Sequence, residues 1–167
     1  FEKNIFIELS EEELSVYKAI RTIFIKAIET GISGRINSIA LEGLLRLRQC
    51  CVSLNLLPKS LTHKGYVKST KIELAVKMIK DFIADGHQIL VFSQFTSALD
   101  ELEERLTQDS VKLLLLTGNT RNRQVLVDSF QNDDKNKVFL ISLKAGGTGL
   151  NLTAADRVIL LDDWWNP

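Results

Sequence analysis

The first third of the chain carries hydrophobic residues at the three- and four-residue spacing of amphipathic helices. Ser10 and Glu13 have the spacing of a capping box, in which each side chain accepts a hydrogen bond from the other residue's backbone N–H. The apolar stripe that follows ends at Gly31, so a helix is predicted between these signals. A second helix is predicted from about residue 38 to residue 51. The polar stretch 60–69, which follows a proline, indicates a boundary.

The pattern changes after residue 70, where helices and strands alternate. Four uninterrupted apolar runs lie at residues 89–92, 113–116, 138–141 and 158–161. A helical pattern precedes the first run, and others lie between the first three. Short apolar strands joined by helices are typical of parallel sheets that are buried on both faces. We therefore predict an α/β fold, in which a parallel sheet flanked by helices (67–167) follows an N-terminal helical segment (1–66).

Polar or glycine-rich segments follow the predicted strands. Ser93 and Gln94 come directly after the first strand, and Thr117 and Gly118 come after the second. A segment rich in glycine, 142–149, follows the third. Ligands of open α/β sheets bind beyond the carboxyl ends of the strands. These segments therefore contain the candidate site.

The glycine-rich segment is the strongest local signal. Gly146, Gly147 and Gly149 occupy three of four positions, and Lys144 precedes them. Glycines let the backbone approach a ligand closely, so that N–H groups can point at phosphate oxygens. The same glycines also suit a tight turn that binds nothing, and the pattern alone leaves both interpretations open. The sequence contains neither G-x-x-x-x-G-K-[ST] nor G-x-G-x-x-G.

Composition narrows the class of protein. A length of 167 residues is typical of one domain, and a hydrophobic share of 45% can fill its core. The 21 basic residues balance the 21 acidic ones, so any binding of nucleic acid must depend on a local feature. Cys50 and Cys51 suit a reducing compartment, because adjacent cysteines make a strained disulfide. We expect no membrane segment, since no apolar stretch reaches about 18 residues.

The remaining polar candidates are interpreted as surface residues. His63 and His87 lie in polar contexts without a partner at metal-ligand spacing. Arg121 and Arg123 precede a predicted helix and could contact phosphate, although a solvated helix face is the favoured interpretation.

The last six residues form an acidic and aromatic segment. Trp164 and Trp165 would either cap the core or reach a nucleic-acid groove. Adjacent side chains on a strand point to opposite faces, so Asp162 and Asp163 are not expected to share a metal ion. The first residue is not Met, and the last residues follow directly on a strand. We therefore expect the chain to be a piece of a longer protein.

Six segments, taken in order, resemble the C-terminal motor lobe of the Swi/Snf-type DNA translocases of helicase superfamily two. The segments are L-R-L-R-Q-C-C at 45–51, S-T-K-I at 69–72, Q-I-L-V-F-S-Q-F-T at 88–96, the stretches 118–130 and 142–156, and V-I-L-L-D-D-W-W-N-P at 158–167. Val52-Ser53 replaces the His-Pro that often follows the first segment. The short interval after Gly118 and the Ser-Leu-Lys at 142–144 are similar to bacterial members, which predicts a bacterial, cytoplasmic and nucleoid-associated protein.

The resemblance implies a RecA-like second lobe that contributes DNA-backbone contacts and part of an ATP site between two lobes. The implied partners are double-stranded DNA and the N-terminal RecA-like lobe of the same chain, and the implied cofactors are ATP and Mg²⁺. The residues that would hold the tracked DNA strand are Ser93, Gln94, Thr117, Gly118, Lys144, Ala145 and Gly146, with Trp165 near the minor groove. The residues that would face the nucleotide are Gly147, Gly149 and Asn151.

Other parts of such a motor lie outside this sequence. The family's Walker A lysine and Asp-Glu box belong to the first lobe, and its motif VI arginines follow W-N-P. We therefore expect DNA-dependent ATPase and translocase activity of the full-length chain only, and an isolated fragment without catalytic residues, bound cofactor or activity. Two other functions stay open. One is a non-catalytic nucleic-acid-binding or scaffold module with a degenerate motor fold, and the other is an α/β enzyme for a phosphorylated small molecule.

Overall fold

The chain divides into two compact units, residues 1–71 and residues 72–167. The computed structural model describes residues 2–31, 35–62, 65–147 and 149–162. The boundary predicted from the sequence, between residues 66 and 67, lies shortly before this division. The first unit is helical, and the second contains the sheet.

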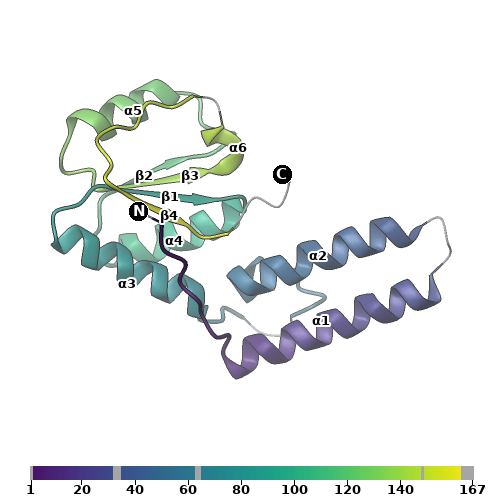
Figure 1. Ribbon diagram of the computed structural model, residues 1–167. Coiled ribbons are helices and arrows are strands. Elements are labelled where there is room, and N and C mark those ends of the chain that lie inside the picture. The colour runs from purple at the N-terminus through teal and green to yellow at the C-terminus, as the bar shows by residue number, and fades with distance from the viewer. Residues whose placement is uncertain (1, 32–34, 63–64, 148, 163–167) are drawn as a thin grey trace. The chain divides into compact units, whose positions relative to one another are not determined.

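Two long helices make up most of the first unit. Its elements are α1 (Glu11–Thr30), α2 (Ile36–Val52) and the short 3-10 helix η2 (Leu54–Leu56). Figure 1 shows α1 and α2 side by side along their length. A Cβ atom on Gly43 of α2 would lie 2.8 Å from Cγ of Phe24 on α1, so glycine permits the close approach of the helices. Ile20, Cys50 and Leu54 form the buried core between them.

Glu13 combines the cap of α1 with a second set of hydrogen bonds. The predicted capping box is confirmed, because Ser10 N–H donates to Glu13 Oε2 over 2.8 Å and Glu13 N–H donates to Ser10 Oγ over 3.2 Å. The same carboxylate accepts from Thr70 N–H at 3.0 Å and from Thr70 Oγ1 at 2.6 Å. Glu13 is only 1% exposed. Burial raises the pKa of Glu13, but the hydrogen bonds from Thr70 and Ser10 outweigh it and hold the pKa below its ordinary value.

The second unit is a four-stranded parallel sheet with helices on both faces. The strands are β1 (Ile89–Ser93), β2 (Leu113–Leu116), β3 (Val138–Ser142) and β4 (Arg157–Leu160). The helices are α3 (Thr70–Ala84), α4 (Thr96–Gln108), α5 (Arg123–Asn132) and α6 (Leu143–Gly146). The first two residues of α3 belong to the first unit. The strand order is β2-β3-β1-β4, and every pair is parallel. The predicted α/β class is therefore confirmed.

The helices divide between the two faces of the sheet. Figure 1 shows α3 and α4 on one face and α5 on the other. A salt bridge of 3.0 Å between Arg105 Nη2 and Glu73 Oε1 joins α4 to α3. The α5 face is filled by a buried cluster that includes Leu116, Phe130 and Phe139. The short helix α6 is a feature that the sequence pattern did not predict.

Strand β4 differs from the prediction that all four strands are buried on both faces. All five residues of β3 are buried, because β3 lies inside the sheet between β2 and β1. In β4, by contrast, Val158 is 60% exposed and Leu160 is 61% exposed. Among the described residues, this strand is the last in the order of the sheet and β1 is its single partner. Within the described part of the chain, these two side chains remain open to solvent.

The substitution Glu13→Gln tests the contribution of the buried carboxylate. An amide nitrogen cannot accept a hydrogen bond, so at least one of the bonds from Ser10 and Thr70 is lost. We expect the free energy of unfolding to fall by about 2 kcal/mol, measured by urea unfolding. The control is Glu11→Gln in the same helical turn, where the side chain is exposed and the loss should stay below about 1 kcal/mol.

Wild type and Glu13→Gln also test how the stabilisation by Glu13 depends on pH. Because the native pKa of Glu13 lies below the unfolded one, its stabilisation is complete above the unfolded value of about 4.3. The stabilisation is lost as the pH falls through the native pKa. The stability difference between wild type and Glu13→Gln should therefore shrink in acid, and a difference that is constant from about pH 7 to about pH 3 would contradict this account.

Candidate nucleic-acid interface

The candidate residues gather where the four parallel strands end. We call this side of the sheet, formed by the carboxyl-terminal ends of the strands, the carboxyl edge. Gln94 follows β1, Thr117 and Gly118 follow β2, and Lys144 follows β3. Strands β2, β3 and β1 are neighbours in the sheet, so the three loops are also neighbours. Gly118 and Lys144 are exposed, and Gln94 and Thr117 are half-buried. We call these four the carboxyl-edge residues.

Ser93 is not available at this edge, although the sequence placed it among the DNA-binding candidates. It is the last residue of β1 and is fully buried. Its hydroxyl donates to Asp162 Oδ2 over 2.5 Å and accepts from Phe95 N–H over 3.0 Å. The other carboxylate oxygen, Asp162 Oδ1, accepts from Gln94 N–H over 3.1 Å. Ser93 therefore fixes the loop after β1, and its side chain does not project from it.

The loop after β2 is closed by a local turn. Thr117 N–H donates to Thr120 Oγ1 over 3.0 Å, and Thr120 N–H donates back to Thr117 O over 3.1 Å. A Cβ atom on Gly118 would have no atom within 4 Å. The turn thus presents Gly118 in an open position, where another molecule can approach the backbone closely.

The segment after β3 forms the helical turn α6 instead of an open loop. Ser142 Oγ caps α6 by accepting from Ala145 N–H over 3.3 Å. Ala145 is buried, and its carbonyl oxygen accepts a hydrogen bond from Arg123 Nη2. Arg123 is thus half-buried and bonded to α6, which corrects its interpretation as a residue of a solvated face, whereas Arg121 is exposed as expected. Lys144 projects from the fixed turn as its exposed cation.

Gly146 is needed where it lies because α6 packs against β1. A Cβ atom at this position would lie 3.1 Å from Cε1 of Phe92 and 3.2 Å from Cγ2 of Ile141. These separations are shorter than ordinary carbon contacts. Gly146 therefore has a packing role between two neighbouring strands, besides the predicted contact with DNA, for which its half-buried position leaves partial access.

The three predicted nucleotide-facing residues differ in what they can offer. Gly147, Gly149 and Asn151 are all exposed. The Gly147 N–H already donates to Leu143 O over 3.2 Å, as the end of α6. Gly149 has a φ of +64°, a left-handed conformation that favours glycine. These residues form an uncharged surface, so they can accommodate a nucleotide but cannot neutralise its phosphates.

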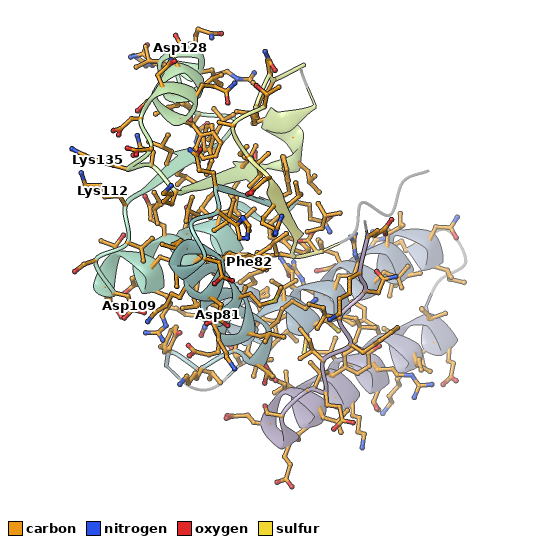
Figure 2. All side chains as sticks on the ribbon, turned by 60° about the vertical axis from the view of Figure 1, so that its left-hand side comes forward. Asp81, Phe82, Asp109, Lys112, Asp128 and Lys135 are labelled. Carbon is orange, nitrogen blue, oxygen red and sulfur yellow. The ribbon has the colours of Figure 1, made fainter. Side chains whose placement is uncertain are left out.

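The opposite edge, formed by the amino-terminal ends of the strands, carries charged residues to which the sequence analysis assigned no role. Figure 2 shows Lys112 and Lys135 projecting on one side of this unit, just before β2 and β3 begin. His87 is not a free surface residue, because its Nδ1 lies 2.6 Å from Asp156 Oδ2 and its Nε2 lies 2.9 Å from Arg157 Nη2. The hydrogen bond with His87 lowers the pKa of Asp156. This cluster ties the start of β4 to β1, far from the carboxyl ends.

The described residues contain neither a metal-binding cluster nor a membrane span. Among them, no three His, Cys, Asp or Glu side chains are grouped so that they could hold a metal ion. None of the helices in the described ranges has the length and hydrophobicity needed to span a bilayer. The predicted contact Trp165 lies outside the described residues, as do Trp164, Asp163 and His63.

Sequence reasoning missed the two side chains that hold the carboxyl edge in place. Asp162 is 69 residues from Ser93 in the chain, and Arg123 is 22 residues from Ala145. No local spacing links either pair. The available signal is that Asp162 lies two residues after the end of β4 and Arg123 begins α5, both at the same end of the sheet.

Comparisons with known proteins agree with this geometry. Residues 70–167 match the family described as the helicase conserved C-terminal domain. The chain is 43% identical over 99 residues to "Helicase swr1" of Schizosaccharomyces pombe, a match that covers 58% of this chain and 8% of that protein. It is 32% identical to "Protein CHROMATIN REMODELING 8" of Arabidopsis thaliana, over 98% of this chain and 14% of that protein. The chain thus spans less than a fifth of the length of these relatives.

Two solved structures from Sulfolobus solfataricus have the same fold. The SWI2/SNF2 ATPase C-terminal domain superposes with a TM-score of 0.85 at 28% identity, covering 98% of this chain and 72% of that one. The SWI2/SNF2 ATPase core in complex with dsDNA superposes with a TM-score of 0.82 at 25% identity, covering 98% of this chain and 35% of that one.

The comparisons overturn one expectation. The features after Gly118 and at 142–144 predict a bacterial, cytoplasmic and nucleoid-associated protein, and this prediction is wrong. The fungal and plant relatives are eukaryotic and include a protein named for chromatin remodelling. A shortened loop and one substituted three-residue segment are small local features, and they do not identify the source of a chain.

The substitution Gly146→Val tests the packing of α6 against β1. The added side chain must displace Phe92 or Ile141, so we expect the free energy of unfolding to fall by about 1–3 kcal/mol. The matched control is Gly118→Val, where the new side chain meets open space and the change should stay within about 0.5 kcal/mol. Urea unfolding of both variants measures the difference, and equal losses would show that Gly146 has no special packing role.

Proposed function

Because the chain belongs to the family of helicase conserved C-terminal domains, as the C-terminal lobe of a Swi/Snf-type helicase, we propose that it works in the full-length protein as the second lobe of an ATP-dependent translocase on double-stranded DNA. The observation that carries this proposal is the set of carboxyl-edge residues at three neighbouring strand ends. They offer an amide, a hydroxyl and an ammonium group, all of which bind phosphate oxygens. Phosphate contacts hold DNA without reading its bases, which suits a motor that moves along any sequence.

Within this edge, the residues divide into those that bind and those that support. Gln94, Thr117, Gly118 and Lys144 are accessible, and we assign the contacts with the DNA backbone to them. Buried groups lie behind them: Ser93 fixes the loop after β1, and Ala145 holds α6 through Arg123. The contact of Trp165 with the minor groove stays a prediction.

The ATP site would be shared with the N-terminal RecA-like lobe of the same chain. Gly147, Gly149 and Asn151 fit one wall of such a site, because they are exposed and Gly149 allows close approach of the backbone. None of the three carries a charge. The groups that bind Mg²⁺ and neutralise the phosphates must therefore be residues other than these three. Hydrolysis of bound ATP would supply the free energy for repeated closing and opening of the two lobes.

A non-catalytic nucleic-acid-binding or scaffold module is the alternative. It would retain the carboxyl-edge residues and the fold but would not couple them to ATP. The third possibility, an enzyme for a phosphorylated small molecule, would need a charged phosphate-binding group beside the exposed glycines. In the described part of the chain, the basic residues nearest to these glycines in sequence are Lys144 and Arg157. Arg157 is bonded to His87 at the opposite edge, which leaves Lys144 as the candidate.

Release of phosphate from ATP tests the proposed function. We expect the full-length protein to hydrolyse ATP slowly alone and several-fold faster with duplex DNA, because contact with DNA at the carboxyl edge favours the closed, catalytic arrangement of the lobes. The fragment 1–167 should release no phosphate, since its sequence contains no Walker A motif. Single-stranded DNA at the same nucleotide concentration is the control for the duplex. Duplex binding without any hydrolysis would contradict the motor and support the nucleic-acid-binding module. Stimulation by a phosphorylated small molecule instead of DNA would support the third possibility.

A further inference from the structure

Asp162 links the end of β4 to the loop after β1 through both carboxylate oxygens. Oδ2 accepts the proton of the Ser93 hydroxyl over 2.5 Å, and Oδ1 accepts the Gln94 N–H over 3.1 Å. The two partners are consecutive residues, so one carboxylate fixes both the buried end of β1 and the first residue beyond it. Asp162 itself is half-buried.

The sheet holds Asp162 firmly. The preceding residue, Leu161, is buried and donates its N–H to Phe92 O over 3.0 Å. This bond extends the pairing of β4 with β1 by one residue beyond the last strand pair, Phe92 with Leu160. The carboxylate therefore projects from backbone that is anchored to β1.

The hydroxyl of Ser93 connects Asp162 to the start of helix α4. It gives its only proton to Asp162 and accepts the N–H of Phe95, the residue that precedes α4. Phe95 is 9% exposed and is packed at the start of that helix. Gln94 thus lies between two fixed residues, and its backbone N–H is held by Asp162. The half-buried side chain of Gln94 therefore starts from a backbone position that is fixed at the carboxyl end of β1.

From these contacts we propose that Asp162 is a positioning residue, which holds the Ser93-Gln94 turn so that Gln94 meets the DNA backbone. The inference rests on the proposed function and deepens it, because it replaces the predicted direct contact of Ser93 with an indirect role. Ser93 and Asp162 then act as one unit. Loss of either partner breaks their shared hydrogen bond, so loss of both has less effect than the two separate losses added together.

A double-mutant cycle in the full-length protein tests this proposal. The variants are Ser93→Ala, Asp162→Asn and the double variant, and the readout is the duplex concentration that gives half-maximal stimulation of ATP hydrolysis. We expect each single variant to raise this concentration about tenfold, as the loss of a hydrogen bond to a charged group implies. The effect of the double variant should be clearly smaller than the two single effects combined, because the singles share one bond. The maximal rate should change by less than about twofold, because the bonds hold a binding group. The control is Asp100→Asn on α4, where the aspartate is exposed and wild-type behaviour is expected.

A second measurement reports on the turn directly. Amide hydrogen exchange at Gln94 should be faster in Asp162→Asn than in wild type or in Asp100→Asn, since the acceptor of its N–H is weakened. Unchanged exchange overturns the proposal, whatever the protein does with DNA. Additive losses in the cycle also overturn it, because they would mean that Ser93 and Asp162 act separately. If duplex does not stimulate the wild type, the proposed function has failed, and exchange at Gln94 alone then decides whether Asp162 holds the turn.

Discussion

The candidate site depends on the parallel pairing of four strands. Ser93 is level with Ser142, and Leu116 is level with Ile141, so the strands end at nearly the same height. Loops that are far apart in sequence thereby become neighbours along a single edge. An antiparallel neighbour would bring the start of a strand to this edge, and the polar segments after the strands would be divided between two ends of the sheet. The proposed DNA-binding surface thus depends first on the topology of the sheet, which brings its residues together.

Three partly buried hydrogen bonds, two from Asp162 and one from Arg123, join the loops of this edge in adjacent pairs. Asp162 joins the end of β4 to the loop after β1, and Arg123 joins the start of α5 to the turn after β3. Between the two pairs, Gly146 lies against Phe92. The accessible groups therefore rest on a continuous support. Such preorganisation matters for a motor, because it has to grip and release phosphates repeatedly without refolding its loops.

The sequence was informative where the structure depends on local patterns. An apolar run is enough to identify a strand, and the spacing of Ser10 and Glu13 is enough to identify a helix cap. The position of a strand within the sheet is not local, so the exposure of Leu160 on the edge strand could not be predicted. The same limit applies to the bonds of Ser93 and Arg123, because their partners come from distant parts of the chain. Motif resemblance placed these positions in a predicted site, but it did not show which of their side chains are buried.

The central claim is that the carboxyl edge, and not the opposite edge, contacts DNA phosphates. The most direct measurement is the salt dependence of duplex binding by the full-length protein and by two variants, Lys144→Gln at the carboxyl edge and Lys135→Gln at the opposite edge. Each phosphate contact contributes about −0.9 to the slope of log K against log salt concentration. The account predicts that Lys144→Gln makes the slope less steep by about 0.9 while Lys135→Gln leaves it unchanged. The reverse result, or equal changes in both variants, would contradict it.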